Sequence, residues 1–232
     1  MTNEDREAAL IWSWMANADA WTRTVREGRI ASRRLATDAA IVDAVAERNP
    51  ERVLDLGCGE GWLMRALAER GIEAIGLDVS LELVMAAEEA GGGRYRCCSY
   101  EELVEDPTRA GGPYDAIACN FSLLGADLVP LLRALRRNLP PGGALVIQTV
   151  HPWTAAGDEG YADGWRTETF DAFGDDFAEP MPWYFRTLGS WVDALRDGGF
   201  HLATLREPIH PETGQPASLV MVAEVEVEVE AG

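Results

Sequence analysis

The segment Val53–Gly61 constrains the fold of this chain more than any other part of the sequence. It overlaps Arg52–Leu56, a short apolar run rich in branched residues, which predicts a buried strand. Three glycines then allow a tight turn and a close approach of the backbone to a ligand. A helical stretch at about 61–70 follows, and then an apolar strand, Glu73–Leu77, with Asp78 at its tip. Together these elements predict half of a nucleotide-binding unit.

The glycine pattern departs from the fingerprint of dinucleotide-binding proteins. That fingerprint is Gly-x-Gly-x-x-Gly, whereas Gly61 comes one residue early and Trp62 stands where a small residue is needed. Asp55 would also place a negative charge beside two phosphates, which is unfavourable. The pattern therefore favours a ligand that carries positive charge and no phosphate. The alternative is a glycine loop that only connects a strand to a helix.

The segment Val53–Gly61, with Asp78 one strand further on, resembles the signature of class I S-adenosylmethionine-dependent methyltransferases. S-adenosylmethionine has an ammonium, a sulfonium and a ribose diol, and no phosphate. The resemblance implies methyl transfer to an O, N or C atom of a small-molecule acceptor, with S-adenosylhomocysteine as product. It also implies an α/β Rossmann-like three-layer sandwich. Its mostly parallel seven-stranded sheet would have a C-terminal antiparallel hairpin, N-terminal helices and an inserted cap.

The rest of the chain alternates between strand and helix patterns, which predicts a parallel sheet covered on both faces. We expect strands at Arg52–Leu56, Glu73–Leu77, Arg94–Cys97, Ala116–Cys119 and Ala144–Thr149, with helices at about 61–70, 80–90, 100–105 and 127–138. We expect one methyltransferase domain in four parts: an N-terminal helical cap (1–48), a cofactor-binding core (50–150), an inserted substrate cap (152–187) and a C-terminal helix and strand hairpin (188–230).

Residues 152–187 have poor strand and helix signals but many aromatic side chains, and eight acids stand against two arginines. A long irregular segment in a compact domain is usually functional, so we expect a lid there, and the acids favour an amine-bearing acceptor. Further on, helix 188–198 and the strands Phe200–Arg206 and Ser218–Glu228 are expected. The Val-Glu alternation at Val225–Glu230 predicts a half-exposed edge strand.

Ligands of an open parallel sheet bind beyond the carboxyl ends of its strands, so residues after each strand are the candidates. The resemblance assigns the ribose to Asp78, adenine to Val79, the adenine edge to Ser99 and Tyr100, and the methionine part to Asn120 and Phe121. Cofactor contacts are thus expected from Arg33, Asp55, Gly57, Cys58, Gly59, Gly61, Asp78, Val79, Ser99, Tyr100, Asn120 and Phe121.

Several of these residues have structural alternatives. Tyr100 would then only start a helix, Phe121 would be core, and Asn120 would satisfy a turn. Arg33 or Arg34 could pair with the methionine carboxylate, because a guanidinium fork suits a carboxylate. The alternative for both arginines is a solvated helix face.

His151 follows the fifth predicted strand and is the candidate general base, since imidazole accepts a proton near neutral pH. The alternative is a histidine that only hydrogen-bonds the cap. Trp153, Tyr184 and Arg186 are candidate substrate contacts, with aromatic packing as the alternative for the last two. The spacing of the three histidines and four cysteines does not predict a metal site.

The composition narrows the function further. The formal net charge is −19, which disfavours nucleic acid and anionic membranes as partners. All twenty basic residues are arginine, so mechanisms that need a lysine are excluded. The run Asn120-Phe121-Ser122-Leu123 lacks the Pro-Pro-aromatic sequence of DNA amino-methyltransferases. We expect a cytoplasmic monomer or homodimer with reduced thiols and no signal peptide or membrane span.

Three other functions remain open on the sequence. The same fold can use S-adenosylmethionine differently, for example by cyclising the cofactor. A dinucleotide-dependent oxidoreductase is poorly matched at Trp62. A binding module without catalysis would hold the cofactor but turn over no acceptor.

Overall fold

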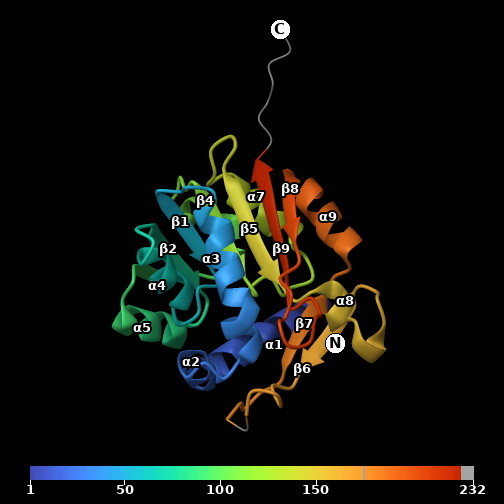
Figure 1. Cartoon of the computed structure of the whole chain (residues 1–232). Coiled ribbons are helices and arrows are strands. Elements are labelled where there is room, and N and C mark those ends of the chain that lie inside the picture. Colours follow the sequence, from blue (N-terminus) through green and yellow to red (C-terminus); the bar gives the residue numbers. More distant parts are fainter. Residues whose placement is uncertain (175, 226–232) are drawn as a thin grey trace.

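The fold is built around one seven-stranded sheet, shown in Figure 1. The structure, a computed structural model, describes residues 1–174 and 176–225. The strand order is β3-β2-β1-β4-β5-β9-β8, and only β9 runs antiparallel to its neighbours. The strands are β1 Arg52–Leu56, β2 Glu73–Asp78, β3 Arg94–Cys97, β4 Ala116–Asn120, β5 Ala144–Thr149, β8 Phe200–Arg206 and β9 Leu219–Val225. The predicted fold class is confirmed, and the first five strands agree with their predicted bounds within one residue.

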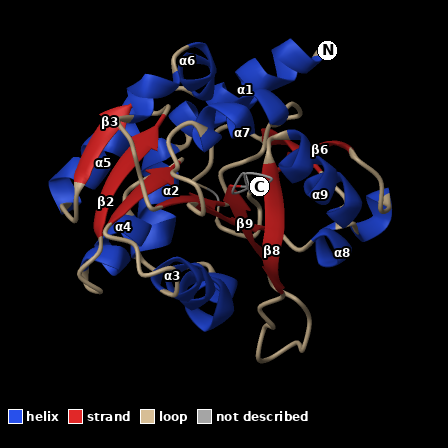
Figure 2. Ribbon diagram, turned by 90° about the horizontal axis from the view of Figure 1, so that it is seen from above, coloured by secondary structure: helices blue, strands red, loops and turns tan. Residues whose placement is uncertain are grey.

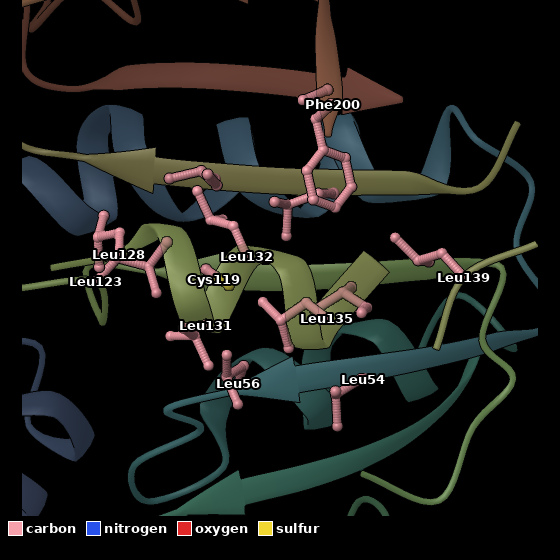
Figure 3. Packing of buried hydrophobic residues seen from close by; sticks show 14 of the residues in the cluster. Leu54, Leu56, Cys119, Leu123, Leu128, Leu131, Leu132, Leu135, Leu139 and Phe200 are labelled. Atoms are coloured by element: carbon pink, nitrogen blue, oxygen red, sulfur yellow. The ribbon is translucent and has the colours of Figure 1, made fainter. Parts of the chain in front are cut away.

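Helices cover both faces of the sheet, which makes three layers (Figure 2). One face is packed by α3 (Asp38–Ala46), α4 (Trp62–Ala68) and α5 (Leu81–Ala90), and the other by α6 (Tyr100–Glu105), α7 (Val129–Arg136) and α9 (Leu188–Asp197). Figure 3 shows the apolar core on the face covered by α6, α7 and α9, where leucines of α7 pack against those of β1. Because these strands are buried on both faces, their sequences are continuous apolar runs, and those runs are the pattern from which the strands were predicted.

Polar caps fix where the helices begin. Ser80 accepts a hydrogen bond from the backbone of Leu83 at the start of α5, and Ser99 forms a capping box with Glu102 at the start of α6. Thr187 accepts a hydrogen bond from the N–H of Ser190 at the start of α9. Each cap satisfies a backbone N–H that the helix itself leaves unpaired. The remaining helices are α1 Asn3–Ala16, α2 Ala18–Arg26, a π-helical turn Arg33–Thr37, two 3-10 turns at Pro107–Ala110 and Gly157–Glu159, and α8 Pro152–Ala155.

Residues 152–187, here called the inserted segment, are more regular than the sequence predicted. They contain an antiparallel hairpin of β6 (Gly164–Glu168) and β7 (Met181–Phe185). The rings of Trp165 and Tyr184 meet edge to face across it, with their centroids 5.6 Å apart. The proline at position 182 argues against a strand in sequence, but a two-stranded ribbon leaves one side of each strand unpaired and so tolerates it. The expectation of an irregular segment was therefore wrong.

The end of the sheet also differs from its predicted arrangement. β9 lies between β5 and β8, so it is an internal strand, and β8 is the edge. The predicted edge strand at Val225–Glu230 is thus wrong at Val225, and residues 226–230 lie outside the described residues. The alternating burial that marks an edge is found instead in β8. The predicted antiparallel hairpin of the last two strands is confirmed.

The N-terminal helices pack against the inserted segment, although about 150 residues separate them in sequence. A third apolar cluster joins Leu10 of α1 to Phe170 and Met181. Asn17, buried between α1 and α2, donates from Nδ2 to the carbonyl of Glu179 at 2.7 Å and accepts at Oδ1 from the N–H of Ala178 at 2.8 Å. One buried amide therefore fastens the two segments together.

We expect Asn17→Ala to lower the free energy of unfolding by about 2–3 kcal/mol, because it leaves the hydrogen-bond partners of a buried amide unpaired. Asn3→Ala is the matched control. Asn3 joins the same two segments through one exposed bond from Trp165, and its loss should cost below about 0.5 kcal/mol. Urea unfolding followed by tryptophan fluorescence measures both. Equal losses would contradict the role given to Asn17.

Candidate functional site

The glycine turn after β1 is held against the end of β2 by one carboxylate. Asp78 accepts a hydrogen bond from the N–H of Gly59 at Oδ2 (2.8 Å) and from the N–H of Ser80 at Oδ1 (2.9 Å). The N–H groups of Gly57 and Cys58 both donate to the carbonyl of the residue before Asp78. Because a carboxylate oxygen can accept two hydrogen bonds, each oxygen of Asp78 keeps capacity for a ligand.

The three glycines of the turn have different physical reasons to be glycine. All have positive φ, at 73°, 55° and 84° for Gly57, Gly59 and Gly61. A Cβ at Gly57 would lie 2.3 Å from Cβ of Ser122, and one at Gly61 would lie 2.5 Å from the hydroxyl of Tyr95. At Gly59 the nearest atom is Nε1 of the Trp21 indole, at 3.8 Å. Gly59 therefore borders the open space of the turn, whereas the other two make room for protein side chains.

Two buried carboxyl groups lie side by side behind this turn. Asp55 on β1 is almost fully buried, and its Oδ2 has no hydrogen-bond partner in the structure. Burial, and the nearby charge of Asp78, raise the pKa of Asp55 to about 8. Burial also raises the pKa of Asp78, while its backbone donors oppose that shift. A cation at the turn would relieve both costs, because an opposite charge stabilises the ionised form.

The loops after β2 and β3 use most of their polar groups internally. The hydroxyl of Ser99 caps α6, and the hydroxyl of Tyr100 donates to the carbonyl of Ser122 at 3.1 Å. Val79 is half-buried beside Asp78. The side chain of Cys58 points back into the sheet, where its sulfur would meet a Cβ at Gly76, so Cys58 offers only its backbone to the turn. Tyr100 is the first residue of α6, which matches its structural alternative, and Ser99 is the N-cap of the same helix.

The loop after β4 carries a strained backbone and a buried amide network. Phe121 has φ of 52°, a conformation that is uncommon for a residue other than glycine and gathers at functional sites. Asn120 accepts from Gln148 of β5 at 2.7 Å. The same amide of Gln148 donates to the carbonyl of Thr37, and its oxygen accepts from Ser218. Gln148 thus fixes the rim position of Asn120, a role that the sequence did not suggest.

His151 has partners at both ring nitrogens. Its Nδ1 accepts the N–H of Trp153, which caps α8, and its Nε2 lies 2.8 Å from Glu207. With Nδ1 accepting, the ring proton is on Nε2 and is donated to the carboxylate. Neither nitrogen is free to take a proton from an acceptor. The geometry therefore argues against the predicted general base and matches the structural alternative.

Glu60, which is not among the predicted site residues, anchors the N-terminal helices to the glycine turn. Its fully buried carboxylate pairs with Arg26 of α2 at 3.0 Å and with Arg65 of α4 at 2.7 Å. An acid inside a glycine turn next to a helix start was the only signal in the sequence. Arg33, the predicted carboxylate ligand, pairs with Asp38 and stacks 4.4 Å over the ring of Trp62.

A small cavity lies where the loops after β4 and β5 meet β7 and α9. Its lining includes Thr149, Pro152, Tyr184 and Arg186. Two of the three predicted substrate residues, Tyr184 and Arg186, are therefore brought together at the carboxyl edge of the sheet. The third, Trp153, is 71% exposed and is not part of this lining.

A family model described as a methyltransferase domain matches residues 28–205, about three quarters of the chain. The chain belongs to this methyltransferase family. The predicted resemblance to class I S-adenosylmethionine-dependent methyltransferases is confirmed.

Curated relatives match part of this methyltransferase. A ubiquinone biosynthesis O-methyltransferase of Xanthomonas oryzae pv. oryzae is 36% identical over 111 residues, which are 45% of each chain. One of Xylella fastidiosa is 35% identical over 125 residues, 50% of this chain and 49% of the relative. The matched region thus spans about half the length of these relatives.

Solved structures share the fold of the methyltransferase. A 1,6-didemethyltoxoflavin-N1-methyltransferase of Burkholderia thailandensis, with bound 1,6-didemethyltoxoflavin and S-adenosylhomocysteine, superposes with a TM-score of 0.66 at 21% identity. That match covers 98% of this chain and 92% of the other. A putative S-adenosylmethionine-dependent methyltransferase of Listeria monocytogenes gives 0.64 at 21% identity, covering 82% and 100%.

Over residues 1–174 and 176–225, no three His, Cys, Asp or Glu side chains gather as a metal site would require. Over the same residues, no helix combines the length and apolar character needed to cross a bilayer. Cys58, Cys98 and Cys119 are buried, Cys97 is exposed, and all four are free thiols.

We expect Asp55→Asn to stabilise the ligand-free methyltransferase increasingly as pH rises. With its pKa raised to about 8, the folded state holds a proton that the unfolded chain releases near pH 4. The stability that Asp55 contributes is therefore complete below about pH 4 and is lost as pH rises to about 8. Thermal unfolding between about pH 5 and pH 8.5 measures the difference. The exposed Asp19→Asn is the control. A difference that does not grow with pH would contradict the burial of an uncompensated carboxyl.

Proposed function

We propose that this methyltransferase transfers the methyl group of S-adenosylmethionine to a small-molecule acceptor at the carboxyl edge of the sheet. The observation that carries the proposal is the pair of buried carboxyl groups at the glycine turn. Asp55 has an oxygen without a partner, and Asp78 has unused acceptor capacity. A ligand with hydroxyl donors and positive charge satisfies both.

The residues around the turn fit this cofactor. Asp78 would accept hydrogen bonds from the ribose hydroxyls, Gly59 leaves its backbone open to the ligand, and Val79 supplies apolar contact. Asp55, which is buried behind the turn, would attract the positive charge of the methionine part without touching it. The cofactor supplies a methyl group that its sulfonium already activates.

The N-terminal cap (1–48) and the inserted substrate cap (152–187) would together exclude water from the core (50–150), with the C-terminal part (188–230) completing one domain. The buried contacts of Asn17 and the pairing of Glu60 with Arg26 support a shared cover over the edge of the sheet. Water exclusion strengthens electrostatic interactions with the reacting groups.

The chain's contribution to the reaction is then mainly positioning. Aligning an acceptor atom with an activated methyl group can remove roughly 7–11 kcal/mol of the barrier. The strained loop at Phe121, fixed through Asn120 and Gln148, stands between the cofactor side and the acceptor side of the edge. Because His151 is committed at both nitrogens, the acceptor would lose its proton to water or carry no proton to lose.

The S-adenosylhomocysteine and small acceptor bound in the Burkholderia protein support a small-molecule substrate here too. The unpartnered Asp55 argues against a dinucleotide, whose phosphates would add negative charge beside it. Chromatography of the products separates the remaining uses of the cofactor. Methyl transfer yields S-adenosylhomocysteine in step with a methylated acceptor, cyclisation yields methylthioadenosine, and a binding module yields neither.

We expect Asp78→Asn to weaken S-adenosylhomocysteine binding about tenfold or more, because an amide offers one acceptor where ribose and backbone donors need several. Titration calorimetry measures the affinity. Glu82→Gln, on the exposed start of α5, is the control and should bind as the wild type does. Unchanged affinity in Asp78→Asn would remove the ribose assignment.

We expect His151→Gln to lower the melting temperature while changing turnover by no more than about twofold, since the histidine caps α8 and pairs with Glu207. A general base at this position would instead contribute roughly 10²–10⁴-fold. Steady-state rates and thermal unfolding of the same preparation decide between the two. A hundredfold loss of turnover with intact cofactor binding would restore His151 as the base.

A further inference from the structure

The indole nitrogen of Trp21 lies beside the glycine turn. Trp21 is on α2, and Figure 1 shows this helix beyond the carboxyl end of the sheet. Its Nε1 is the atom nearest to the position that a Cβ of Gly59 would take, at 3.8 Å. Gly59 is the glycine that borders the open space of the turn, so the indole nitrogen borders the same space.

This indole N–H has no partner among the described residues, 1–174 and 176–225. Over that part of the chain the indole of Trp165 donates to Asn3, whereas the indole of Trp21 donates to no acceptor. Trp21 is half-buried, and its Nε1 is not among the fully buried polar atoms that lack a partner, so this N–H reaches solvent. An indole nitrogen can only donate. Trp21 therefore offers a hydrogen-bond donor to a ligand that fills the turn.

Neighbouring groups fix the orientation of this donor. The ring of Trp14 on α1 meets the ring of Trp21 edge to face, with centroids 5.3 Å apart, and Phe173 of the inserted segment does the same at 6.4 Å. The ion pair between Arg26 and the buried Glu60 holds α2 itself against the turn. The indole is thus oriented before a ligand arrives, and a donor already held in place loses less conformational freedom on binding.

The methionine part of S-adenosylmethionine carries a carboxylate as well as an ammonium. The two buried acids at the turn attract the positive groups of the cofactor but repel this carboxylate, so it needs a donor. Arg33, the expected ligand of the carboxylate, pairs with Asp38 and stacks over the ring of Trp62. The side-chain donor that the structure places against Gly59 is the indole of Trp21.

We propose that Trp21 is a cofactor-binding residue whose indole N–H donates to the methionine carboxylate of S-adenosylmethionine. The inference rests on the proposed function, from which it takes the cofactor. Hydrogen bonds to an ionised acceptor are shorter and stronger than those between neutral groups. Trp21 would thus orient the methionine part while Asp78 holds the ribose, and α2 would contribute directly to the affinity for the cofactor.

The experiment compares two ligands that differ in one group. They are S-adenosylhomocysteine and its decarboxylated analogue, in which a hydrogen atom replaces the methionine carboxylate. Titration calorimetry measures both on the full chain, for the wild type, Trp21→Phe and Trp14→Phe. Trp21→Phe keeps an aromatic ring in the cluster and removes the N–H, and Trp14→Phe makes the same change in the neighbouring ring as a matched control.

We expect Trp21→Phe to lower the affinity for S-adenosylhomocysteine about tenfold and to leave the affinity for the analogue within about twofold, because the lost bond has a charged acceptor. Trp14→Phe should leave the ratio of the two affinities within about twofold of the wild-type ratio. A purely structural role of Trp21 would lower both affinities together and would not change their ratio.

Two-dimensional NMR of the indole N–H groups gives a second measurement that needs only the wild type, so it decides the matter even where Trp21→Phe does not fold. The chain has eight tryptophans. We expect one indole signal to move downfield with S-adenosylhomocysteine and not with the decarboxylated analogue, since a hydrogen bond to a carboxylate deshields the proton. Indole signals that respond alike to the two ligands would overturn the proposal.

An equal loss of both ligands in Trp21→Phe would overturn the assignment, and so would an unchanged affinity for S-adenosylhomocysteine. The proposed function fails separately. If neither ligand binds the wild type, the cofactor itself is wrong. If S-adenosylhomocysteine binds and also forms in step with a methylated acceptor, while Trp21→Phe changes nothing, the function stands and only the role of Trp21 is lost.

Discussion

The carboxylate of Asp78 holds together the part of the structure on which the rest depends. By accepting from the N–H groups of Gly59 and Ser80, it joins the glycine turn after β1 to the loop after β2. The turn is thereby fixed at the carboxyl edge of the sheet, with Gly59 open toward the ligand. Burial raises the pKa of Asp78, because the ionised carboxylate is poorly solvated there. A cationic ligand would stabilise the ionised form.

The cover over this edge is built from two distant parts of the chain that act as one unit. Asn17 joins the N-terminal helices to the inserted segment, and Arg26 joins the same helices to Glu60 of the glycine turn. The cofactor side and the acceptor side are consequently linked through α1 and α2. A displacement of these helices would therefore shift both the glycine turn and the inserted segment, because each link has a buried residue at one or both ends.

Unsatisfied polar groups of opposite sign mark the two sides of the edge. Asp55 has an unpartnered oxygen near the glycine turn, and Arg186 has an unpartnered nitrogen in the cavity beside β5. Native proteins leave few buried polar atoms without partners, so each such atom calls for an explanation, such as an ordered water or a bound ligand. A cationic ligand at the turn would stabilise the ionised form of Asp55.

The sequence by itself determined the parallel core, because apolar runs, glycine turns and terminal acids are local patterns that record burial and backbone conformation. It placed the first five strands within one residue, and it located the turn and Asp78. Only the tertiary structure decided which polar groups have hydrogen-bond partners and which do not. The commitment of His151 to Glu207, the hairpin that carries Arg186, and the free donor of that arginine all depend on contacts between residues far apart in the chain. Hydrogen-bond partners at such separations are set by how the layers pack, and no local pattern encodes them.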